Sequence, residues 1–496
     1  MQPGAFNRVP AHHFDLDQYP GYTARPILTV MGRSFNSNKK VARRALAGPR
    51  PLRVWLRALH GHYARDLIDA SIVLGAIGGG VAGIWFAARA SALDPLVDYI
   101  ELGDWARLII EPSVVWAIMG AVMLLLRILF WLRYKPEPPA AFTRAPMLTV
   151  VIPAYNEGAM VERAIGSVAT AEYPPGKLEV FVVDDGSKDD TWTYIERAAS
   201  CHPQLITAIR FTENRGKRAA LAEGFAKARG ELVVTIDSDS EITPGSLLAL
   251  AGPFRDPKVG AVAGKVTVLN VHEGLIPRML KIRYILSFDF LRAYQSVFRT
   301  VYTCPGALAA YRTSVVRNIL PAWMNQRFLG VACTFGEDRA MTNWILAAGY
   351  DAVYQNKAVV RTIVPITYRK LSRMYLRWDR SYVREDLRLG RIVWRRPLHL
   401  IPLVLLDKLI TNLRFPVGYA LIGLLVFLAP SHPIMLVRFG LAVGLAAGFY
   451  SLFYLRSERS WDAFYGVIYA YYSLVALSWI FPWAVVTVRA KAWLTR

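Results

Sequence analysis

Two aspartates flank a serine in the sequence Asp237-Ser238-Asp239, which follows the apolar segment ELVVTI of this 496-residue chain. Carboxylates two positions apart on a turn can converge on one hard divalent cation, Mg²⁺ or Mn²⁺, and leave coordination sites open for substrate phosphates. Such a cation would act as a Lewis acid toward a departing diphosphate. The alternative is that these residues merely cap a turn or a helix. The buried strand predicted before them favours the metal site.

Two further polar clusters also follow apolar segments. The sequence DDGS, which contains Asp185, directly follows the apolar segment LEVFVV. The carboxylate of Asp185 could accept hydrogen bonds from a base or a ribose, or it could cap a strand-to-helix turn. Tyr155 and Glu157 follow LTVVIPA and could provide stacking and polar contacts to the same base. The basic sequence NRGKR opens a predicted helix. A helix N-terminus together with Lys217 suits a phosphate, and a solvated basic loop is the alternative.

The sequence GEDR begins the predicted helix RAMTNWILAAG, and Asp338 within it is a candidate general base. When a sugar is transferred through an oxocarbenium-like transition state, a carboxylate must take the proton from the attacking hydroxyl. A helix N-terminus would favour the ionised form of Asp338. Thr334 and Glu337 have the spacing of a capping box, so a purely structural role is the alternative for Glu337.

The dipeptide Arg377-Trp378 lies in a basic amphipathic stretch. Its indole could stack on a sugar face while its guanidinium binds a phosphate or a carboxylate. The alternative is an interfacial tryptophan beside an arginine that binds lipid headgroups.

The segments around these residues alternate regularly between predicted strands and predicted helices. From residue 146 to residue 365 apolar strands alternate with helices, which predicts an α/β domain with a mostly parallel sheet covered on both faces. Ligands of such sheets bind at the carboxyl ends of the strands. The clusters YNE, DDGS and DSDS stand at those ends, so we expect them to share one edge of the sheet and to form an active site.

Apolar segments of the length needed to cross a bilayer flank this domain. Segments 67–90 and 113–132 predict two membrane helices within 63–136, and segments near 402–429, 433–455 and 463–488 predict about three more within 398–490. The acidic loop between the first two belongs outside by the positive-inside rule, so the central domain is expected to be cytoplasmic. Three C-terminal spans would put the basic tail VRAKAWLTR outside, which conflicts with that rule.

Basic segments accompany the spans. No cleavable signal peptide is evident, and residues 1–62 are expected to form a flexible, basic cytosolic tail. The stretches 274–299 and 366–397 predict amphipathic helices in the membrane interface, with ordinary helices packed on the soluble core as the alternative. The net charge of +22 therefore favours a lipid surface over nucleic acid as partner.

Several classes of protein are disfavoured. The three cysteines have no metal-ligand spacing, which argues against a disulfide framework and against a structural zinc site. The sequence contains no GxxxxGK[ST] loop, which argues against an ATP-driven transporter.

Taken in order, VVIPAYNE, VVDDGS, IDSDS, GEDR and RW resemble the motif series of the processive family-2 glycosyltransferases, which include cellulose, chitin and hyaluronan synthases. The segments TCPGALAAYR, WMNQRFLGVACTFGEDRAMTN and RWDRSYVRED are similar to hyaluronan synthases and to nodulation-type chitin-oligosaccharide synthases. The resemblance covers about residues 147–388. It implies a GT-A-like domain between transmembrane helices, with interfacial helices.

The resemblance also implies residue roles. Tyr155, Glu157, Asp185 and Lys217 would hold the UDP moiety, Arg377 would touch the diphosphate, Asp237 and Asp239 would bind Mn²⁺ or Mg²⁺, Asp338 would be the base for inversion, and Trp378, Cys304, Gly306, Glu337 and Arg312 would lie near the sugars. The C-terminal spans and the interfacial helices would form a channel for the nascent polysaccharide. One departure is Met374, which stands where the family motif QxxRW has glutamine, and which could alter the acceptor site or processivity.

The sequence thus predicts an inverting glycosyltransferase embedded in the inner or plasma membrane, which extends a polysaccharide from a UDP-sugar. The resemblance implies UDP-N-acetylglucosamine, alone or alternating with UDP-glucuronic acid. A non-processive enzyme that adds one sugar to a membrane lipid is the alternative. A non-catalytic binding or transport protein is a third, which the intact Asp239 and Asp338 disfavour.

Overall fold

The computed structural model describes residues 71, 74, 75, 78 and 104–490. Of the membrane helix expected at 67–90, only residues 71, 74, 75 and 78 are described, and all four are helical. The expected tail at 1–62, residues 91–103 of the acidic loop and the last six residues lie outside the described residues. Residues 104–112, which were expected to belong to that loop, instead form the start of helix α3 (Asp104–Arg133).

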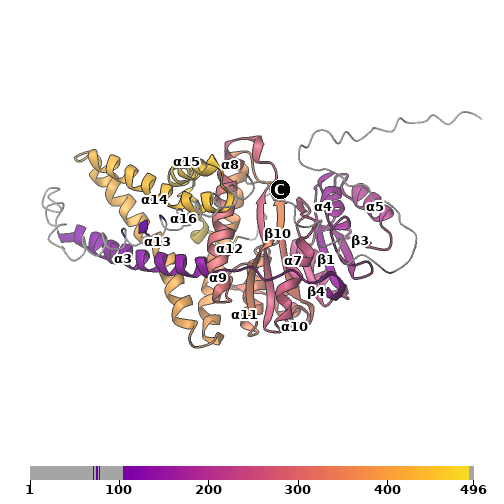
Figure 1. Ribbon diagram of the computed structural model, residues 1–496. Helices are drawn as coiled ribbons and strands as arrows, with labels where there is room; N and C mark the ends of the chain where they lie inside the picture. Colours follow the sequence, from indigo (N-terminus) through magenta and orange to yellow (C-terminus); the bar gives the residue numbers. More distant parts are fainter. Residues whose placement is uncertain (1–70, 72–73, 76–77, 79–103, 491–496) are drawn as a thin grey trace, which may run out of the picture. The chain divides into compact units, whose positions relative to one another are not determined.

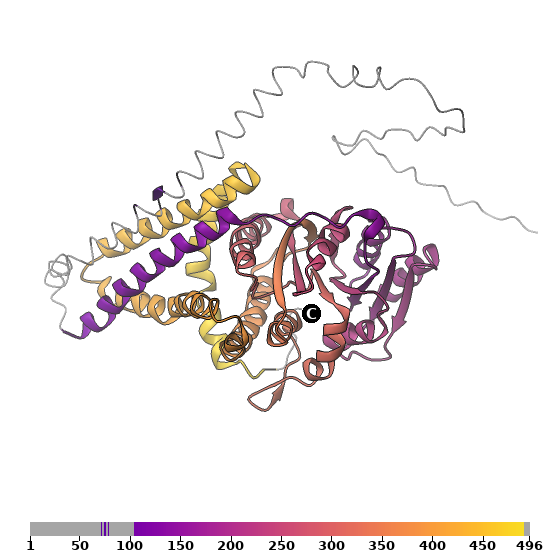
Figure 2. The same cartoon turned by 60° about the horizontal axis from the view of Figure 1, so that its bottom comes forward.

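Eight strands of the described chain form one sheet, in the order β3-β2-β1-β4-β7-β6-β10-β5 (Figures 1 and 2). β3, β2, β1 and β4 are parallel, β7 is antiparallel to β4 and β6, β10 is parallel to β6, and β5 is antiparallel to β10. The predicted α/β fold with a mostly parallel sheet is therefore confirmed. The strands are β1 Leu148–Ala154, β2 Leu178–Asp184, β3 Ile206–Arg210, β4 Leu232–Ile236, β5 Ser240–Ile242, β6 Val259–Val268, β7 Leu308–Arg312 and β10 Asp351–Thr362, and β8 Arg327–Phe328 and β9 Val331–Ala332 form a separate hairpin.

The central strands lie in the core because helices cover both of their faces. Every residue of β1 and β4 is buried, as their unbroken apolar sequences LTVVIPA and LVVTI predict. Gly224 of α6 lies so close to β1 that a Cβ there would be 2.4 Å from a methyl group of Val151. The helices that pack on the sheet are α4 Met160–Ala169, α5 Thr191–Cys201, α6 Lys217–Lys227, α7 Ser246–Ala251, α8 Leu275–Ile285, α9 Ala293–Val297, α10 Thr313–Met324 and α11 Glu337–Ala347.

Three helices of the described chain are long and apolar enough to cross a membrane: Leu108–Arg133 within α3 (Asp104–Arg133), α13 (Ile401–Leu428) and α14 (Ile434–Glu458). They match the expected segments 113–132, 402–429 and 433–455. The last expected span, 463–488, is instead a pair of helical segments, Trp461–Leu477 and Ile480–Val486, bent by 45°. A pair bent in this way is a broken span or a re-entrant loop.

The expected amphipathic segments are both helical. Residues 274–299 form α8, a π-helical turn over Leu286–Arg292, and α9. α8 packs on β6 on one side and on α15 (Phe464–Tyr472) on the other, so it lies between the sheet and the C-terminal helices. Residues 366–397 form the 25-residue helix α12 (Tyr368–Ile392), which packs on α11 and on α16 (Ile480–Val486) (Figure 1).

A buried ion pair joins α3 to α13. The carboxylate of Asp407, which is 1% exposed, accepts hydrogen bonds from Arg127 Nε at 2.8 Å and from the hydroxyls of Tyr294 at 3.1 Å and Tyr302 at 2.7 Å. Arg127 also donates to Thr411 Oγ1 at 2.7 Å. A charge inside a membrane helix is costly unless it is paired, so this network fixes both helices against the segment after α8.

We predict that Asp407→Asn destabilises the protein because it leaves the buried guanidinium of Arg127 without a counter-ion. The expected cost is about 3–5 kcal/mol, measured as a lower thermal unfolding midpoint in detergent. The double variant Arg127→Met/Asp407→Leu should recover most of the midpoint, since it removes both charges. Equal losses in the single and double variants would contradict an essential charge pairing.

Candidate active site

The carboxyl ends of β1, β2 and β4 meet at one edge of the sheet. In the register of the sheet Ala154 lies beside Asp184, and Val151 lies beside Thr235, so the loops that follow all three strands leave the sheet together. The hydroxyl of Ser238 donates to Glu157 Oε1 at 3.0 Å, which ties the loop after β4 to the loop after β1. The structure therefore brings the clusters YNE, DDGS and DSDS together at one edge.

Asp185 holds the loop that precedes α6. Its Oδ1 accepts from the backbone N–H of Arg215 at 2.7 Å, and its Oδ2 accepts from Gly216 N at 2.9 Å. Gly216 has a φ of 90°, which favours glycine, and α6 begins at the next residue. Burial raises the pKa of Asp185, and the two N–H donors oppose that shift. Asp185 thus positions the N-terminus of α6 at the sheet edge.

The ammonium of Lys217 lies between two carboxylates from distant parts of the chain. It forms ion pairs with Asp237, in the loop after β4, and with Glu337 Oε1 at 3.3 Å, at the start of α11. Burial alone would lower the pKa of Lys217, but Asp237 and Glu337 outweigh it and raise that pKa. Gly306 lies against the same ion pair, because a Cβ there would be 3.2 Å from Lys217 Nζ and 3.5 Å from Asp237 Oδ1.

Asp239 is held by hydroxyls on the opposite side of the loop. Its Oδ1 accepts from Ser240 Oγ and Thr362 Oγ1, both at 3.1 Å. Burial, followed by the neighbouring charges of Asp237 and Glu157, raises the pKa of Asp239 to about 6. Crowded carboxylates of this kind are stabilised by a cation.

The donor set fits a divalent metal that shares its coordination with a substrate. Asp237 and Asp239 provide only oxygen ligands, which Mg²⁺ and Mn²⁺ prefer. Within the described part of the chain, no group of three or more His, Cys, Asp or Glu side chains could hold an ion by itself. Phosphate oxygens and water would therefore complete the coordination.

The start of α11 presents Glu337 and Asp338 beside this cluster. Gly336 precedes the helix in the left-handed conformation, with a φ of 75°, and no side chain caps the helix. The capping box predicted for Thr334 and Glu337 is therefore wrong, because the helix begins two residues later than that pattern requires. The carboxylate of Glu337 instead contacts Lys217.

Asp338 has the environment of a base. Arg339 N donates to its Oδ1 at 2.7 Å, as expected for a carboxylate in the first turn of a helix. Burial, followed by the charge of Glu337, raises the pKa of Asp338 above its ordinary value. A raised pKa strengthens the carboxylate as a proton acceptor.

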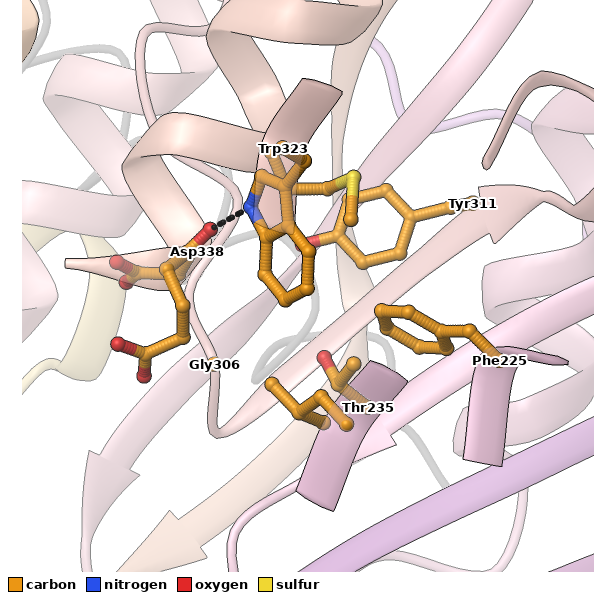
Figure 3. Close-up of a pocket in the computed structure, with 9 residues that line it drawn as sticks. Phe225, Thr235, Gly306, Tyr311, Trp323 and Asp338 are labelled. Carbon is orange, nitrogen blue, oxygen red and sulfur yellow. Dashed lines mark hydrogen bonds between the residues drawn. The ribbon is translucent and has the colours of Figure 1, made fainter. Parts of the chain in front are cut away.

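Two residues that the sequence did not single out support this helix start. Trp323 of α10 is buried, and its Nε1 donates to the carbonyl oxygen of Glu337 at 3.1 Å. Figure 3 shows Trp323 and Asp338 on one side of a small cavity and Phe225, Thr235 and Tyr311 on the other. Arg218 lies 4.8 Å from the Trp323 ring and donates to the Trp323 carbonyl at 2.5 Å.

A sequence signal for these two residues existed but was not specific. Arg218 directly follows Lys217 in NRGKR, and Trp323 precedes the GEDR cluster. Only the packing of α6 against α10 shows that they form one support.

The residues proposed near the sugars do not all lie together. Cys304 is fully buried, burial raises the pKa of its thiol to about 12, and its N–H donates to Thr342 Oγ1 at 2.9 Å. Arg312 pairs in register with Leu232, at the end of β4 opposite Asp237, and its guanidinium donates to Val259 O at 3.2 Å. Arg312 therefore lies at the far edge of the sheet from the carboxylates.

Arg377 and Trp378 are on α12. The charge of Arg377 acts on Glu337 and on Tyr284, which places it toward the carboxylate cluster. The Trp378 ring lies 5.5 Å from that of Tyr375 and 6.3 Å from that of Tyr284, in an aromatic group between α8 and α12. Met374 is buried in the same helix.

Comparison with known families agrees with this geometry. Residues 149–320 match the family model Glycosyl transferase family 2. The chain carries a family 2 glycosyltransferase domain. The matched residues contain the three polar clusters at the sheet edge and Lys217, while Asp338 and the Arg377-Trp378 pair lie beyond them.

Curated relatives resemble the same region. Over 241 residues the chain is 36% identical to an N-acetylglucosaminyltransferase of Rhizobium meliloti (strain 1021), covering 48% of this chain and 56% of the relative. Over 243 residues it is 35% identical to an N-acetylglucosaminyltransferase of Rhizobium leguminosarum bv. viciae, covering 49% and 57%. The chain thus spans little more than half the length of these relatives.

A solved structure shares the fold. The mannosyltransferase PcManGT from Pyrobaculum calidifontis, in complex with GDP-Man and Mn²⁺, aligns with a TM-score of 0.53 and 22% identity over 73% of this chain and 98% of that chain. The predicted GT-A-like fold of the domain is therefore confirmed.

We predict that Gly336→Ala displaces the start of α11. Both Gly336 and Gly349 have positive φ values, 75° and 88°, so alanine at either costs about 1–2 kcal/mol of backbone strain. A Cβ at Gly336 would also lie 2.0 Å from Ser381 Oγ, whereas nothing lies within 4 Å of one at Gly349. Gly336→Ala should lower the unfolding midpoint and the turnover of a nucleotide-sugar more than the matched control Gly349→Ala.

Ser381→Gly in the Gly336→Ala background should restore part of both losses, because it removes the clashing side chain. Equal effects of the two glycine substitutions would show that the contact with Ser381 does not position this helix.

Proposed function

We propose that this protein is an inverting glycosyltransferase that transfers N-acetylglucosamine from a UDP-linked donor to a saccharide hydroxyl at the cytoplasmic face of a membrane. The observation that carries the proposal is the position of Lys217. Its ammonium joins Asp237, in the expected metal-binding sequence, to Glu337, the neighbour of the expected base. A donor diphosphate and an acceptor hydroxyl could therefore be held side by side.

The transfer needs a single displacement. Asp338 accepts the proton of the acceptor hydroxyl as that oxygen bonds to the anomeric carbon and the bond from that carbon to the UDP oxygen breaks. Attack opposite the leaving group inverts the anomeric centre. A cation held by Asp237 and Asp239 would supply charge neutralisation for the leaving diphosphate.

Other side chains would hold the two substrates in place. Lys217 provides a positive charge at a helix N-terminus, where a phosphate is stabilised. Tyr155 and Glu157 stand at the end of β1, where a base would lie. Trp378 offers an aromatic face for the acceptor sugar. Arg377, whose charge reaches Glu337, would contact the diphosphate.

The donor and the product are inferred from likeness. The N-acetylglucosaminyltransferase relatives favour UDP-N-acetylglucosamine as donor, and the motif resemblance adds UDP-glucuronic acid as a second donor. The helices that follow α12 favour a processive enzyme that exports its polysaccharide through its own channel, because a single transfer to a lipid needs fewer of them. If the bent pair after α14 is re-entrant, the basic C-terminal tail lies on the side of the catalytic domain, in agreement with the positive-inside rule.

The proposal predicts release of UDP by purified protein in nanodiscs with Mn²⁺ or Mg²⁺ and UDP-N-acetylglucosamine. Asp338→Asn should lower the rate by about 10²–10⁴-fold, since a positioned base contributes that much, and EDTA should abolish turnover. Asp256→Asn, which changes an aspartate ion-paired with Arg299, is the matched control and should leave the rate unchanged. A high-mass product would establish a synthase, and a short glycolipid the single-transfer alternative. UDP release that survives Asp338→Asn would remove the proposed base.

We also predict how the rate depends on pH. The carboxylate of Asp338 is the active form and its pKa is raised, so kcat/KM should fall as the pH drops through that pKa. Glu337→Gln removes one of the charges that raise this pKa, and the acidic limb should therefore move to lower pH. Glu162→Gln, which changes an exposed pair with Arg197, should leave the limb in place. A limb that stays fixed or moves to higher pH in Glu337→Gln would contradict Asp338 as the titrating group.

A further inference from the structure

One peptide group in the loop before β7 is held at both of its ends. This group joins Thr303 to Cys304. Its carbonyl oxygen, on Thr303, accepts a hydrogen bond from Arg292 Nε at 3.0 Å, and its N–H, on Cys304, donates to Thr342 Oγ1 at 2.9 Å. Arg292 belongs to the π-helical turn and Thr342 to α11. Because a peptide group is planar, the two bonds together fix its orientation.

The hydroxyl of Thr342 makes a second bond, to the backbone of the proposed base. It donates to the carbonyl oxygen of Asp338 at 2.9 Å, one helical turn earlier in α11. Thr342 is fully buried, so bulk water cannot replace either bond if the hydroxyl is removed. A single oxygen atom therefore joins the backbone at Asp338 to the backbone at Cys304.

Farther along, the same loop lies against the ion pair of Lys217. A Cβ at Gly306 would be 3.2 Å from Lys217 Nζ. Gly306 and Asp338 also line the same small cavity (Figure 3). The loop thus lies between the ammonium proposed to hold the diphosphate and the carboxylate proposed to accept the proton. Its position relative to that carboxylate depends on the bonds that Thr342 makes.

The nucleotide side of the site has supports of its own. Asp185 holds the backbone directly before Lys217, and Asp239 accepts hydrogen bonds from two neighbouring hydroxyls. None of these bonds involves Thr342. A change at Thr342 should therefore alter the geometry of the proton-accepting side and leave the nucleotide side in place.

We propose that Thr342 is a positioning residue, which holds the loop 303–306 at the distance from Asp338 that sugar transfer requires. The inference rests on the proposed function, because it assigns the proton transfer to Asp338. Thr342 acts through the backbone of Asp338 and moves no proton itself. A displacement of about 1 Å at a reacting group can cost about 10²-fold in rate, so one hydroxyl in this place can govern turnover.

The first measurement is UDP release by the full-length protein in nanodiscs with UDP-N-acetylglucosamine and Mn²⁺. Thr342→Val keeps the volume of the side chain and removes the hydroxyl, so kcat should fall about tenfold while KM for the donor stays within about twofold. Thr342→Ser keeps the hydroxyl and should retain at least about half of kcat. Thr342→Ala removes the same hydroxyl and leaves more room, which keeps the test decisive if the valine variant does not fold.

Thr313→Val is the matched control. Thr313 is also buried, and its hydroxyl also donates to a backbone carbonyl, that of Gly230, at 2.7 Å. It directly follows Arg312, at the edge of the sheet away from the carboxylates. Thr313→Val loses a bond of the same kind, but kcat should stay unchanged. Equal losses of kcat in the two valine variants, or a loss in Thr342→Ser as large as in Thr342→Val, would overturn the proposal.

The thiol of Cys304 provides a second measurement, which needs no turnover. This thiol is fully buried, whereas Cys201 is exposed and serves as the internal reference. Alkylation by N-ethylmaleimide is followed by peptide mass spectrometry. Cys304 should react about tenfold faster in Thr342→Val than in the unmodified protein or in Thr313→Val, because loss of the buried hydrogen bond makes local opening of the loop easier.

The two measurements separate this inference from the proposed function. Absence of UDP release by the unmodified protein, with faster alkylation of Cys304 in Thr342→Val, would refute the proposed function and leave the loop held by Thr342. Lower kcat in Thr342→Val with Cys304 as protected as in the unmodified protein would overturn the positioning role and leave the proposed function in place.

Discussion

The ammonium of Lys217 holds the site together, because it lies between carboxylates that the chain supplies from opposite sides. Asp237 comes from the end of β4 and Glu337 from the start of α11, about a hundred residues later. Without a cation between them, the half-buried carboxylate of Asp237 and the buried carboxylate of Glu337 would repel each other and raise the cost of bringing α11 to the sheet edge. The ion pairs thus place the proposed base Asp338 beside the loop expected to bind a metal. They also keep a positive charge where a diphosphate would lie.

Much of the remaining structure serves to fix the two ends of this contact. Asp185 accepts hydrogen bonds from the loop before α6 and so fixes where α6 begins, which sets the position of Lys217. Trp323, itself bonded to Arg218, holds the backbone at Glu337, and Gly336 allows α12 to approach closely. These supports use backbone carbonyls and N–H groups. They fix the positions of the carboxylates that contact Lys217 without neutralising the charge of these carboxylates.

Two cations in the candidate membrane helices are likewise paired with side chains of opposite charge. Arg127 and Lys408 each have a carboxylate partner, so they can be explained by pairing alone.

Apolar periodicity and the polar residues at strand ends are local properties, so the sequence was enough to predict the sheet, its polar edge and three of the candidate membrane helices. It also singled out Asp237, Asp239, Lys217 and Asp338, because carboxylates and ammonium groups are the side chains suited to binding a metal, a phosphate or a proton. The partners of these residues appear only in the folded chain: Glu337 pairs with Lys217 and does not complete a capping box, and Arg312 lies at the end of the sheet away from the carboxylates. The roles of Trp323 and Arg218 and the bend after α14 were also decided there. The physical reason is that these features depend on contacts between residues far apart in the chain, which no local pattern records.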